Sequence, residues 1–462
     1  MRPMFSRPIS GAGQGGLRIL SARRMGLPVL LSSLALLVGA CGSAGQASSQ
    51  PGAMTPTTPP LSSLALYATG DTGALVALDA ATGAVRWQGQ TGSLSGGKPV
   101  VDPGMVYVGA GNFSRVYAFN AATGKLVWSA AGSLPQVGPV EANGVVFVPT
   151  VNQGQTALTA TLTAYRGDDG ARLWTAPIGG ATLLQPGIVG MAAQGGVVYI
   201  ATYDPGNGAG NGAAQATLHI YAYAAATGAL TWTAQQPTTS AVNASFLITS
   251  ARIYVYFDGV LALNPATGAL LWRSAASPVS GVSGQLALDG KGDHLFTLTA
   301  DGVTAYASAT GAQLWRVVGN QVAMDVADDT IYTFGRASAP SPTSIGATFV
   351  AALDGATGAT RWKNTQLTAQ DLPQTIAAGD GVVFAVTFAG FYALDATTGK
   401  TLWRPQRGPT GGEYIKPIIM AGAVFVGDGP TILAFRLTDG ALLWSNASVT
   451  AMSFPSNLTV AP

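Results

Sequence analysis

The chain has 462 residues, of which only 10% are charged and 48% are hydrophobic, and it contains 61 Gly and 27 Pro. Because a typical soluble domain has about 25% charged residues, this composition favours a turn-rich, mostly β extracellular protein over a helical one. The first 40 residues hold five of the arginines and no acid, so 18 basic and 21 acidic residues remain, a balance that excludes the basic footprint of a nucleic-acid-binding protein.

The N-terminal 40 residues have the pattern of an export signal. A basic stretch, "SARRMG", precedes the apolar run "LPVLLSSLALLVGA", which is too short and too interrupted by serines to cross a bilayer comfortably. The only cysteine, Cys41, follows directly, and "LVGAC" resembles a bacterial lipobox. We therefore predict a lipoprotein signal peptide over residues 1–40 and lipidation of Cys41, which would place an exported, membrane-anchored protein in the extracytoplasmic bacterial cell envelope. The alternative is a plain signal peptide or anchor with an incidental cysteine.

The next segment, residues 41–60, is predicted to be a disordered tether. Its sequence is small, polar and rich in Pro, Ser and Gly, so it cannot bury enough apolar surface to fold. No similar linker recurs before the C-terminus. We therefore expect residues 61–462 to form one domain.

That domain carries an internal repeat that contains every tryptophan of the chain. Successive tryptophans are 40 to 58 residues apart, each has a glycine four residues before it, and each has an alanine ten residues before it. A match at three offsets in nine copies is very unlikely by chance. The tryptophans are Trp87, Trp128, Trp174, Trp232, Trp272, Trp315, Trp362, Trp403 and Trp444.

Each copy of the repeat is predicted to contain a β-hairpin. In "RVYAFNAATGKLVW" (Arg115 to Trp128), two strands flank the turn "NAATG", whose glycine suits a left-handed backbone position and whose Asn or Asp can accept backbone N–H groups. Two more strand-like runs precede each hairpin. Four short strands per repeat are the pattern of a propeller blade, and the fixed alanine is expected to be the small neighbour against which the indole packs.

The motif A-x-D-x-x-T-G-x-x-x-W resembles the tryptophan-docking repeat of the PQQ-like β-propellers, and the likeness covers residues 65 to about 450. That family includes quinoprotein alcohol dehydrogenases and the non-enzymatic outer-membrane assembly lipoprotein BamB. The resemblance implies an all-β propeller, for which eight blades are the family norm, whereas the nine docking motifs predict nine. The C-terminal run "AMSFPSNLTV" would supply the innermost strand of the first blade and close the ring, unless a terminal hairpin lies outside it.

The same resemblance raises the question of whether the tryptophans are core or part of a cofactor site. Quinoprotein dehydrogenases use a tryptophan floor beneath the quinone, a Ca²⁺ ion, an aspartate base and commonly a pair of adjacent cysteines. Here each tryptophan is assigned to docking and the single cysteine to the lipobox, so we predict no catalytic residue, metal or cofactor and a protein that is not an enzyme. The short cluster of Asp289 and Asp293 is interpreted as a turn, not a Ca²⁺ loop, and His219 as a strand residue that packs or faces solvent.

Three repeats are longer than the rest, and each carries its extra length between its second and third strands. Because equivalent loops of a propeller emerge on one side of the ring, this side is the candidate contact surface; the alternative is that these are tolerated, solvated insertions. A further loop of this side, residues 403–416, has the densest cluster of charged and aromatic residues in the mature chain. The residues predicted to contact a partner are Arg404, Arg407, Glu413, Tyr414 and Lys416.

These observations predict a non-enzymatic, lipid-anchored, monomeric propeller that binds envelope or surface proteins through one loop face. Two alternatives remain open. One is a PQQ-dependent or other redox enzyme, and the other is a propeller that binds a carbohydrate or small ligand in its central funnel.

Overall fold

The computed structural model describes residues 59–70, 73–92, 95–110, 115–132, 138–153, 158–183, 187–204, 216–238, 245–257, 259–275, 285–299, 301–337, 346–367, 371–405, 416–447 and 455–461. These residues belong to one compact unit, Thr58–Pro462. The predicted signal peptide, Cys41 and nearly all of the predicted tether lie outside the described residues.

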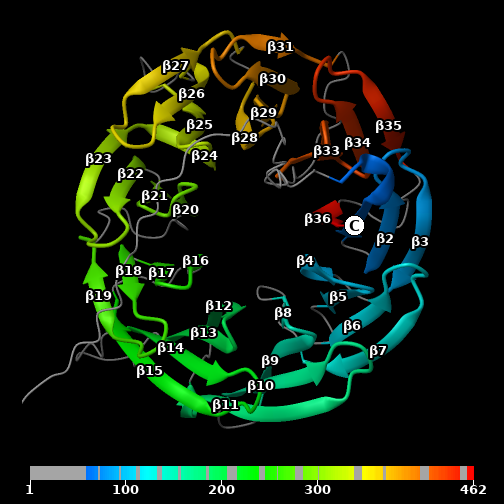
Figure 1. Cartoon of the computed structure of the whole chain (residues 1–462), viewed down its shortest axis with the longest axis vertical. Helices are drawn as coiled ribbons and strands as arrows, with labels where there is room; N and C mark the ends of the chain where they lie inside the picture. Colours follow the sequence, from blue (N-terminus) through cyan, green and yellow to red (C-terminus); the bar gives the residue numbers. More distant parts are fainter. Residues whose placement is uncertain are drawn as a thin grey trace, which may run out of the picture. The chain divides into compact units, whose positions relative to one another are not determined.

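The described part of the chain forms nine four-stranded antiparallel sheets arranged around a ring, as Figure 1 shows. The fold is therefore an all-β, nine-bladed propeller, and the prediction of nine blades is confirmed. The family norm of eight, with a terminal hairpin outside the ring, is wrong for this chain. The described residues include one short 3-10 helix, η1 (Leu61–Ser63), and none of their helices is long and apolar enough to cross a membrane.

Within each blade, the four strands are ordered from the centre of the ring outward. From the innermost strand, blades 1 to 3 contain β36 (Pro455–Ala461), β1 (Ala65–Gly70), β2 (Ala74–Asp79) and β3 (Val85–Gln90); β4 (Ser95–Asp102), β5 (Met105–Ala110), β6 (Arg115–Asn120) and β7 (Leu126–Ala131); and β8 (Val140–Ala142), β9 (Val145–Gln153), β10 (Leu158–Arg166) and β11 (Arg172–Leu183). Blades 4 to 6 contain β12 (Gly187–Gln194), β13 (Val197–Asp204), β14 (Thr217–Ala224) and β15 (Leu230–Pro237); β16 (Ser245–Ile248), β17 (Ile253–Tyr256), β18 (Val260–Leu263) and β19 (Leu270–Arg273); and β20 (Gln285–Leu288), β21 (His294–Thr299), β22 (Gly302–Ala307) and β23 (Gln313–Val318). Blades 7 to 9 contain β24 (Asn320–Ala327), β25 (Thr330–Arg336), β26 (Thr348–Asp354) and β27 (Thr360–Asn364); β28 (Pro373–Gly379), β29 (Val382–Thr387), β30 (Phe391–Asp395) and β31 (Thr401–Trp403); and β32 (Ile418–Met420), β33 (Ala423–Asp428), β34 (Thr431–Arg436) and β35 (Leu442–Asn446).

The last strand closes the ring, as the sequence predicted. β36 pairs with β1 from Ala65↔Ala461 to Thr69↔Asn457, so the C-terminal strand is the innermost strand of the blade that begins the domain. In Figure 1 it lies beside the blue N-terminal strands. Blade 1 is thus completed by residues from both ends of the propeller.

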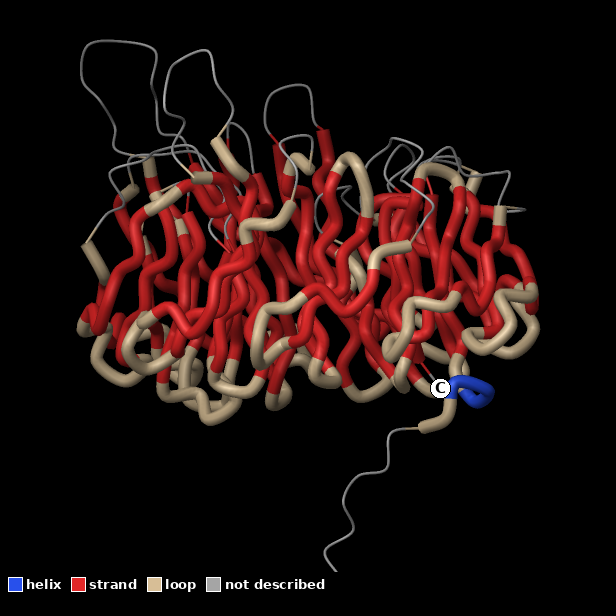
Figure 2. The backbone as a smooth tube through the Cα atoms, turned by 90° about the horizontal axis from the view of Figure 1, so that it is seen from above, coloured by secondary structure: helices blue, strands red, loops and turns tan. Residues whose placement is uncertain are grey.

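The antiparallel order of the strands gives the ring two distinct faces. The hairpin turns that precede each docking tryptophan and the turns between first and second strands share one side, which we call the turn face. The connections between second and third strands, and those between blades, share the other side, which we call the insertion face. η1 and the end of β36 lie at the turn face (Figure 2).

The buried apolar residues of the described segments form nine hydrophobic clusters, each between two successive blades. Middle strands are packed against both neighbouring blades, which explains their continuous runs of Val, Leu, Phe and Ala; β33, for example, is buried along its whole length. Outer strands have one covered face only, and β3 accordingly alternates exposed and buried residues from Arg86 to Gln90.

Candidate functional site

The nine tryptophans each join one blade to the next, and together they link the whole ring. Every indole Nε1 donates a hydrogen bond of 2.7 to 3.0 Å to a backbone carbonyl in the hairpin turn of the following blade. The last of these runs from Trp444 to the carbonyl oxygen of Ala80 and crosses the seam where the ring closes. Trp272 is 9% exposed and donates to the carbonyl of Ser308, so it is core, as predicted.

The indole packs on the glycine of the next turn, which corrects the role given to the alanine. Gly311 has φ +71°, the left-handed value expected from the sequence, and a Cβ placed on it would overlap the Trp272 ring. Ala262, by contrast, is the cross-strand partner of Trp272 within its own blade. Glycine is therefore required at this position, because the backbone is left-handed and the indole ring occupies the place of a Cβ. The small alanine leaves room for the indole beside it on the same sheet.

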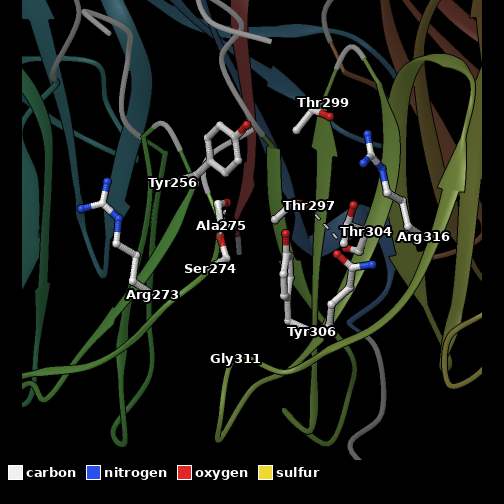
Figure 3. A pocket seen from close by; sticks show the side chains of 12 residues that line it. Tyr256, Arg273, Ser274, Ala275, Thr297, Thr299, Thr304, Tyr306, Gly311 and Arg316 are labelled. Atoms are coloured by element: carbon white, nitrogen blue, oxygen red, sulfur yellow. Dashed lines mark hydrogen bonds between the residues drawn. The ribbon is translucent and has the colours of Figure 1, made fainter. Parts of the chain in front are cut away.

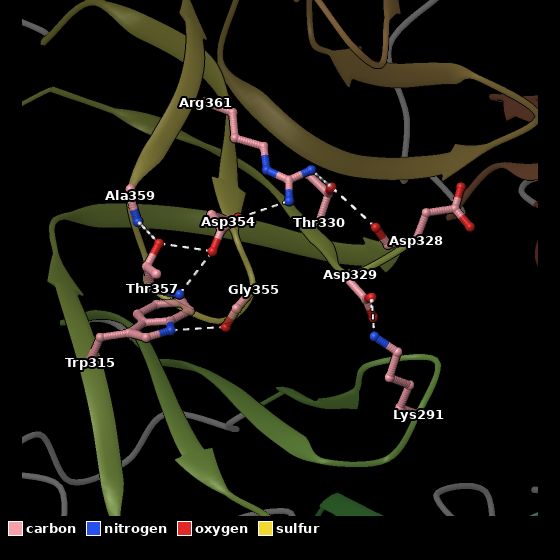
Figure 4. Close-up of polar contacts among 10 residues, drawn as sticks. All are labelled: Lys291, Trp315, Asp328, Asp329, Thr330, Asp354, Gly355, Thr357, Ala359 and Arg361. Atoms are coloured by element: carbon pink, nitrogen blue, oxygen red, sulfur yellow. Dashed lines mark hydrogen bonds and ion pairs between the residues drawn. The ribbon is translucent and has the colours of Figure 1, made fainter.

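An Asp is the first residue of many of these turns, and its carboxylate stabilises the turn by accepting hydrogen bonds. In blade 7, Asp354 accepts hydrogen bonds from the backbone N–H and the hydroxyl of Thr357 at 2.9 and 2.8 Å, and from Arg361 at 2.9 Å (Figure 4). The Arg361 and Thr357 hydrogen bonds lower the pKa of Asp354 to about 2 from an ordinary value of 3.8. Asp79 and Asp395 have the same place in other blades, and their pKa values are also lowered, chiefly by hydrogen bonds from Arg86 and from Thr398 respectively. Asp439 stands later in its turn, and the backbone N–H of Ala441 is the main cause that lowers its pKa.

A pH dependence of stability follows from these carboxylates. Because their pKa values are lower in the folded state, their stabilisation is complete above the ordinary pKa and is lost as the pH falls from about 4 toward 2. We expect the melting temperature to drop over this range, and the drop to be smaller in Asp354→Asn, by about a degree. Calorimetry at pH 7, 4, 3 and 2 measures it. Asp380→Asn, which removes the same charge from the turn face of the next blade, is the control; an unchanged drop in Asp354→Asn would contradict the assignment.

The tryptophans and the acidic side chains of the described residues have structural surroundings. All nine indoles are packed at blade junctions, and no group of three or more His, Cys, Asp or Glu side chains lies close enough to hold a metal among the described residues. The Asp289 carboxylate accepts a hydrogen bond from the backbone N–H of Asp293 at 2.8 Å and contacts Nδ1 of His294 at 2.6 Å. This cluster is therefore a braced turn between β20 and β21. His219 lies on β14, half-buried beside Tyr221.

Two of the five predicted contact residues are described, and each is part of a polar network. Arg404 lies over the ring of Tyr392 at 4.5 Å, with its Nη2 3.8 Å from Oδ1 of Asp371. Asp371 is fully buried, and it accepts hydrogen bonds from the Tyr392 hydroxyl at 2.6 Å and the Thr387 hydroxyl at 3.0 Å. Burial and this carboxylate raise the pKa of Tyr392. Arg404 therefore braces the insertion-face end of blade 8.

Lys416 makes a similar internal contact. Its Nζ is 2.7 Å from Oδ1 of Asp325 on β24, whose other oxygen accepts the backbone N–H of Ala378 on β28 at 2.9 Å. Lys416 thus connects the entry to blade 9 with the inner strands of blades 7 and 8. Arg407, Glu413 and Tyr414 lie outside the described residues.

The three long insertions start and end on the same side of the ring. The strands that flank them, β9 and β10, β13 and β14, and β25 and β26, are in each case the second and third strands of a blade, so their connected ends lie at the insertion face. The residues between these strands lie largely outside the described residues.

Comparison with known proteins identifies the family. The model of one family, outer membrane protein assembly factor BamB, matches residues 44–183, 113–261, 257–345 and 346–461. The chain belongs to the BamB family. The predicted likeness to BamB and the PQQ-like propellers is therefore confirmed. No curated protein matches the sequence of the chain.

Solved structures similar to this BamB family member have little sequence in common with it. BamB from Moraxella catarrhalis is 14% identical, with a TM-score of 0.48, over 75% of this chain and 94% of that one. Quinohemoprotein alcohol dehydrogenase from Comamonas testosteroni is 17% identical, with a TM-score of 0.46, over 82% and 72% of the two chains. Dihydro-heme d1 dehydrogenase NirN, in complex with DHE, is 10% identical, with a TM-score of 0.51, over 89% and 78%. The last comparison shows a shared fold.

Proposed function

We propose that this chain is a non-enzymatic, lipid-anchored scaffold of the bacterial cell envelope that binds other envelope proteins through its insertion face. Membership of the BamB family carries the proposal, because the matching model is that of an outer membrane protein assembly factor. The lipobox-like "LVGAC" before Cys41 supports the anchor. The packing of all nine indoles between blades supports a structural role for the repeat.

The direction from which the chain enters the ring also supports this use of the insertion face. η1 precedes β1 at the turn face, on the side of the ring opposite the connected ends of the long repeats (Figure 2). A chain held to a lipid at Cys41 would therefore be attached through its turn face. The insertion face would then remain accessible to a partner.

Replacing the lipidated residue tests the anchor. We expect Cys41→Ser to move nearly all of the protein from the membrane fraction to the soluble fraction, because a thiol is needed for the lipid bond. Ser43→Ala, two residues away, is the control and should stay with the membrane. Membrane sedimentation of Cys41→Ser equal to that of the unaltered chain would refute the lipoprotein assignment.

Cross-linking in intact cells tests the partner. A defined envelope protein should be captured by the unaltered chain and lost from a variant with Arg407→Ala and Tyr414→Ala, while Lys125→Ala at the turn face should retain it. Capture that is equal in all three would place the contact elsewhere. Tight PQQ binding with Ca²⁺-dependent dye reduction would instead establish the redox alternative.

A further inference from the structure

A groove between blades 6 and 7 has the chemistry of a binding site for an anion. Its volume is about 280 Å³, and its lining includes Arg336 and Lys363 and no Asp or Glu. Lys363 Nζ lies 4.0 Å from the centre of the Phe349 ring, which also lines the groove. No ion pair is formed by either cation within the described part of the chain. Two positive charges therefore face a small cavity without a counter-charge.

Buried polar atoms without hydrogen-bond partners gather at the same place. Gln321 Oε1, Thr333 Oγ1 and Arg336 Nε all belong to lining residues and have no partner among the described residues. Gln321 is 7% exposed and Thr333 only 1%. Because a buried polar group without a partner is costly, several of them around one cavity indicate that a polar ligand completes their hydrogen bonds.

A second groove lies one blade further back along the ring, between blades 5 and 6 (Figure 3). Its volume is about 320 Å³, and its lining includes Arg273, Arg316, Tyr256 and Tyr306 together with three threonines and again no Asp or Glu. Arg316 contacts Asp301 at 3.1 Å, so part of its charge is compensated. Both grooves combine cations, hydroxyl or amide groups and aromatic rings, and they occur at successive blade junctions.

The cations recur at one position of the repeat, directly after the docking tryptophan. Four successive blades, 5 to 8, carry a cation there, and the other five carry Gln, Ser or Thr. The four cations are Arg273, Arg316, Lys363 and Arg404, and all are exposed. They occupy equivalent positions at the outer strands of four successive blades, so they follow one arc of the ring. A ligand whose negative charges repeat would match this arc, whereas a single small anion would use one groove.

We propose that the grooves at the junctions of blades 5 to 7 bind an acidic polysaccharide, with one uronate residue in the blade 6–7 groove and a second in the blade 5–6 groove. The carboxylate of a uronate pairs with Arg336 and Lys363, and its ring hydroxyls meet the amides of Asn320 and Gln321 and the hydroxyl of Thr333. The dense hydroxyl and amide lining favours a sugar over an acidic peptide, whose side chains offer carboxylates but few hydroxyl groups. The ligand of this site is a sugar held at the blade junctions, so the proposal does not rest on the protein partner proposed for the insertion face.

Binding of trigalacturonate to the full-length chain in nonionic detergent, measured by isothermal titration calorimetry, tests this proposal. We expect saturable binding that weakens as salt is raised, and no binding of neutral maltotriose. Lys363→Gln should weaken binding about tenfold, as expected for the loss of one charge-assisted contact. Asn320→Ala should also weaken it. Lys400→Gln removes the same charge from the exposed turn face and should leave binding unchanged.

Three results would overturn the proposal. Absence of trigalacturonate binding at millimolar concentration would show that the grooves do not take a uronate. Equal weakening by Lys400→Gln and Lys363→Gln would show diffuse attraction by net charge instead of a site. Triglutamate binding as tight as that of trigalacturonate would assign the arc to acidic peptides.

Discussion

Trp272→Ala is expected to lower the free energy of unfolding by about 3 to 5 kcal/mol, because it leaves a cavity at the junction of blades 5 and 6. The ring packs on Gly311, makes aromatic contacts with Tyr254 and Tyr306, and donates to the carbonyl of Ser308 at 3.0 Å. All of these contacts are lost together. Equilibrium unfolding in urea, followed by far-UV circular dichroism, measures the change.

The neighbouring residue provides the control for this substitution. Leu271 precedes Trp272 on the same outer strand but is 45% exposed, so Leu271→Ala should cost less than about 0.5 kcal/mol. A loss below about 1 kcal/mol for Trp272→Ala would mean that the indole does not fasten the two blades, and the whole interpretation of the repeat would then be wrong.

Removal of residues 455–462 is expected to abolish the single cooperative unfolding transition and to produce aggregates. The deletion takes away β36, which leaves β1 with a free edge at the centre of the ring and removes Leu458, a buried member of the core between blades 1 and 9. Free strand edges pair readily with other chains. Calorimetry and size-exclusion chromatography measure the two effects.

Adding the missing strand back distinguishes ring closure from a general loss of sequence. A synthetic peptide of residues 455–462 should restore part of the monomer, and a chain that lacks only Pro462 should behave like the unaltered one. A truncated chain that remains monomeric with an unchanged melting curve would show that blade 1 does not need its fourth strand.

Sequence reasoning was sufficient for the architecture because the fold is repetitive. The spacing of Gly, Ala and Trp identified nine blades, and the unpaired C-terminal run indicated how the ring closes. The roles of Gly311 and Ala262 could not be separated in this way, because both are small residues at fixed offsets from Trp272. Only the structure shows that one lies in the next blade and the other in the same sheet.

The surface was harder to predict than the core. The cluster of charged and aromatic residues at 403–416 predicted a contact site, but the sequence does not show which of these charges form ion pairs within the fold. Arg404 and Lys416 proved to contact Asp371 and Asp325, which are distant in sequence. The cations after the tryptophans of blades 5 to 8 were visible in the sequence as a column of the repeat. Only the structure shows that three of them, Arg273, Arg316 and Lys363, line grooves between neighbouring blades.

Closure of blade 1 by β36 has a consequence for the order of events during biosynthesis. The partner that completes the first blade is made last, nearly 400 residues after β1. A chain exported as proposed would reach the far side of the membrane with its first sheet incomplete, and the sheet would stay incomplete until translation and translocation had finished. Throughout that interval β1 presents an open edge, and a chaperone that shields extended strands would have its most useful site there.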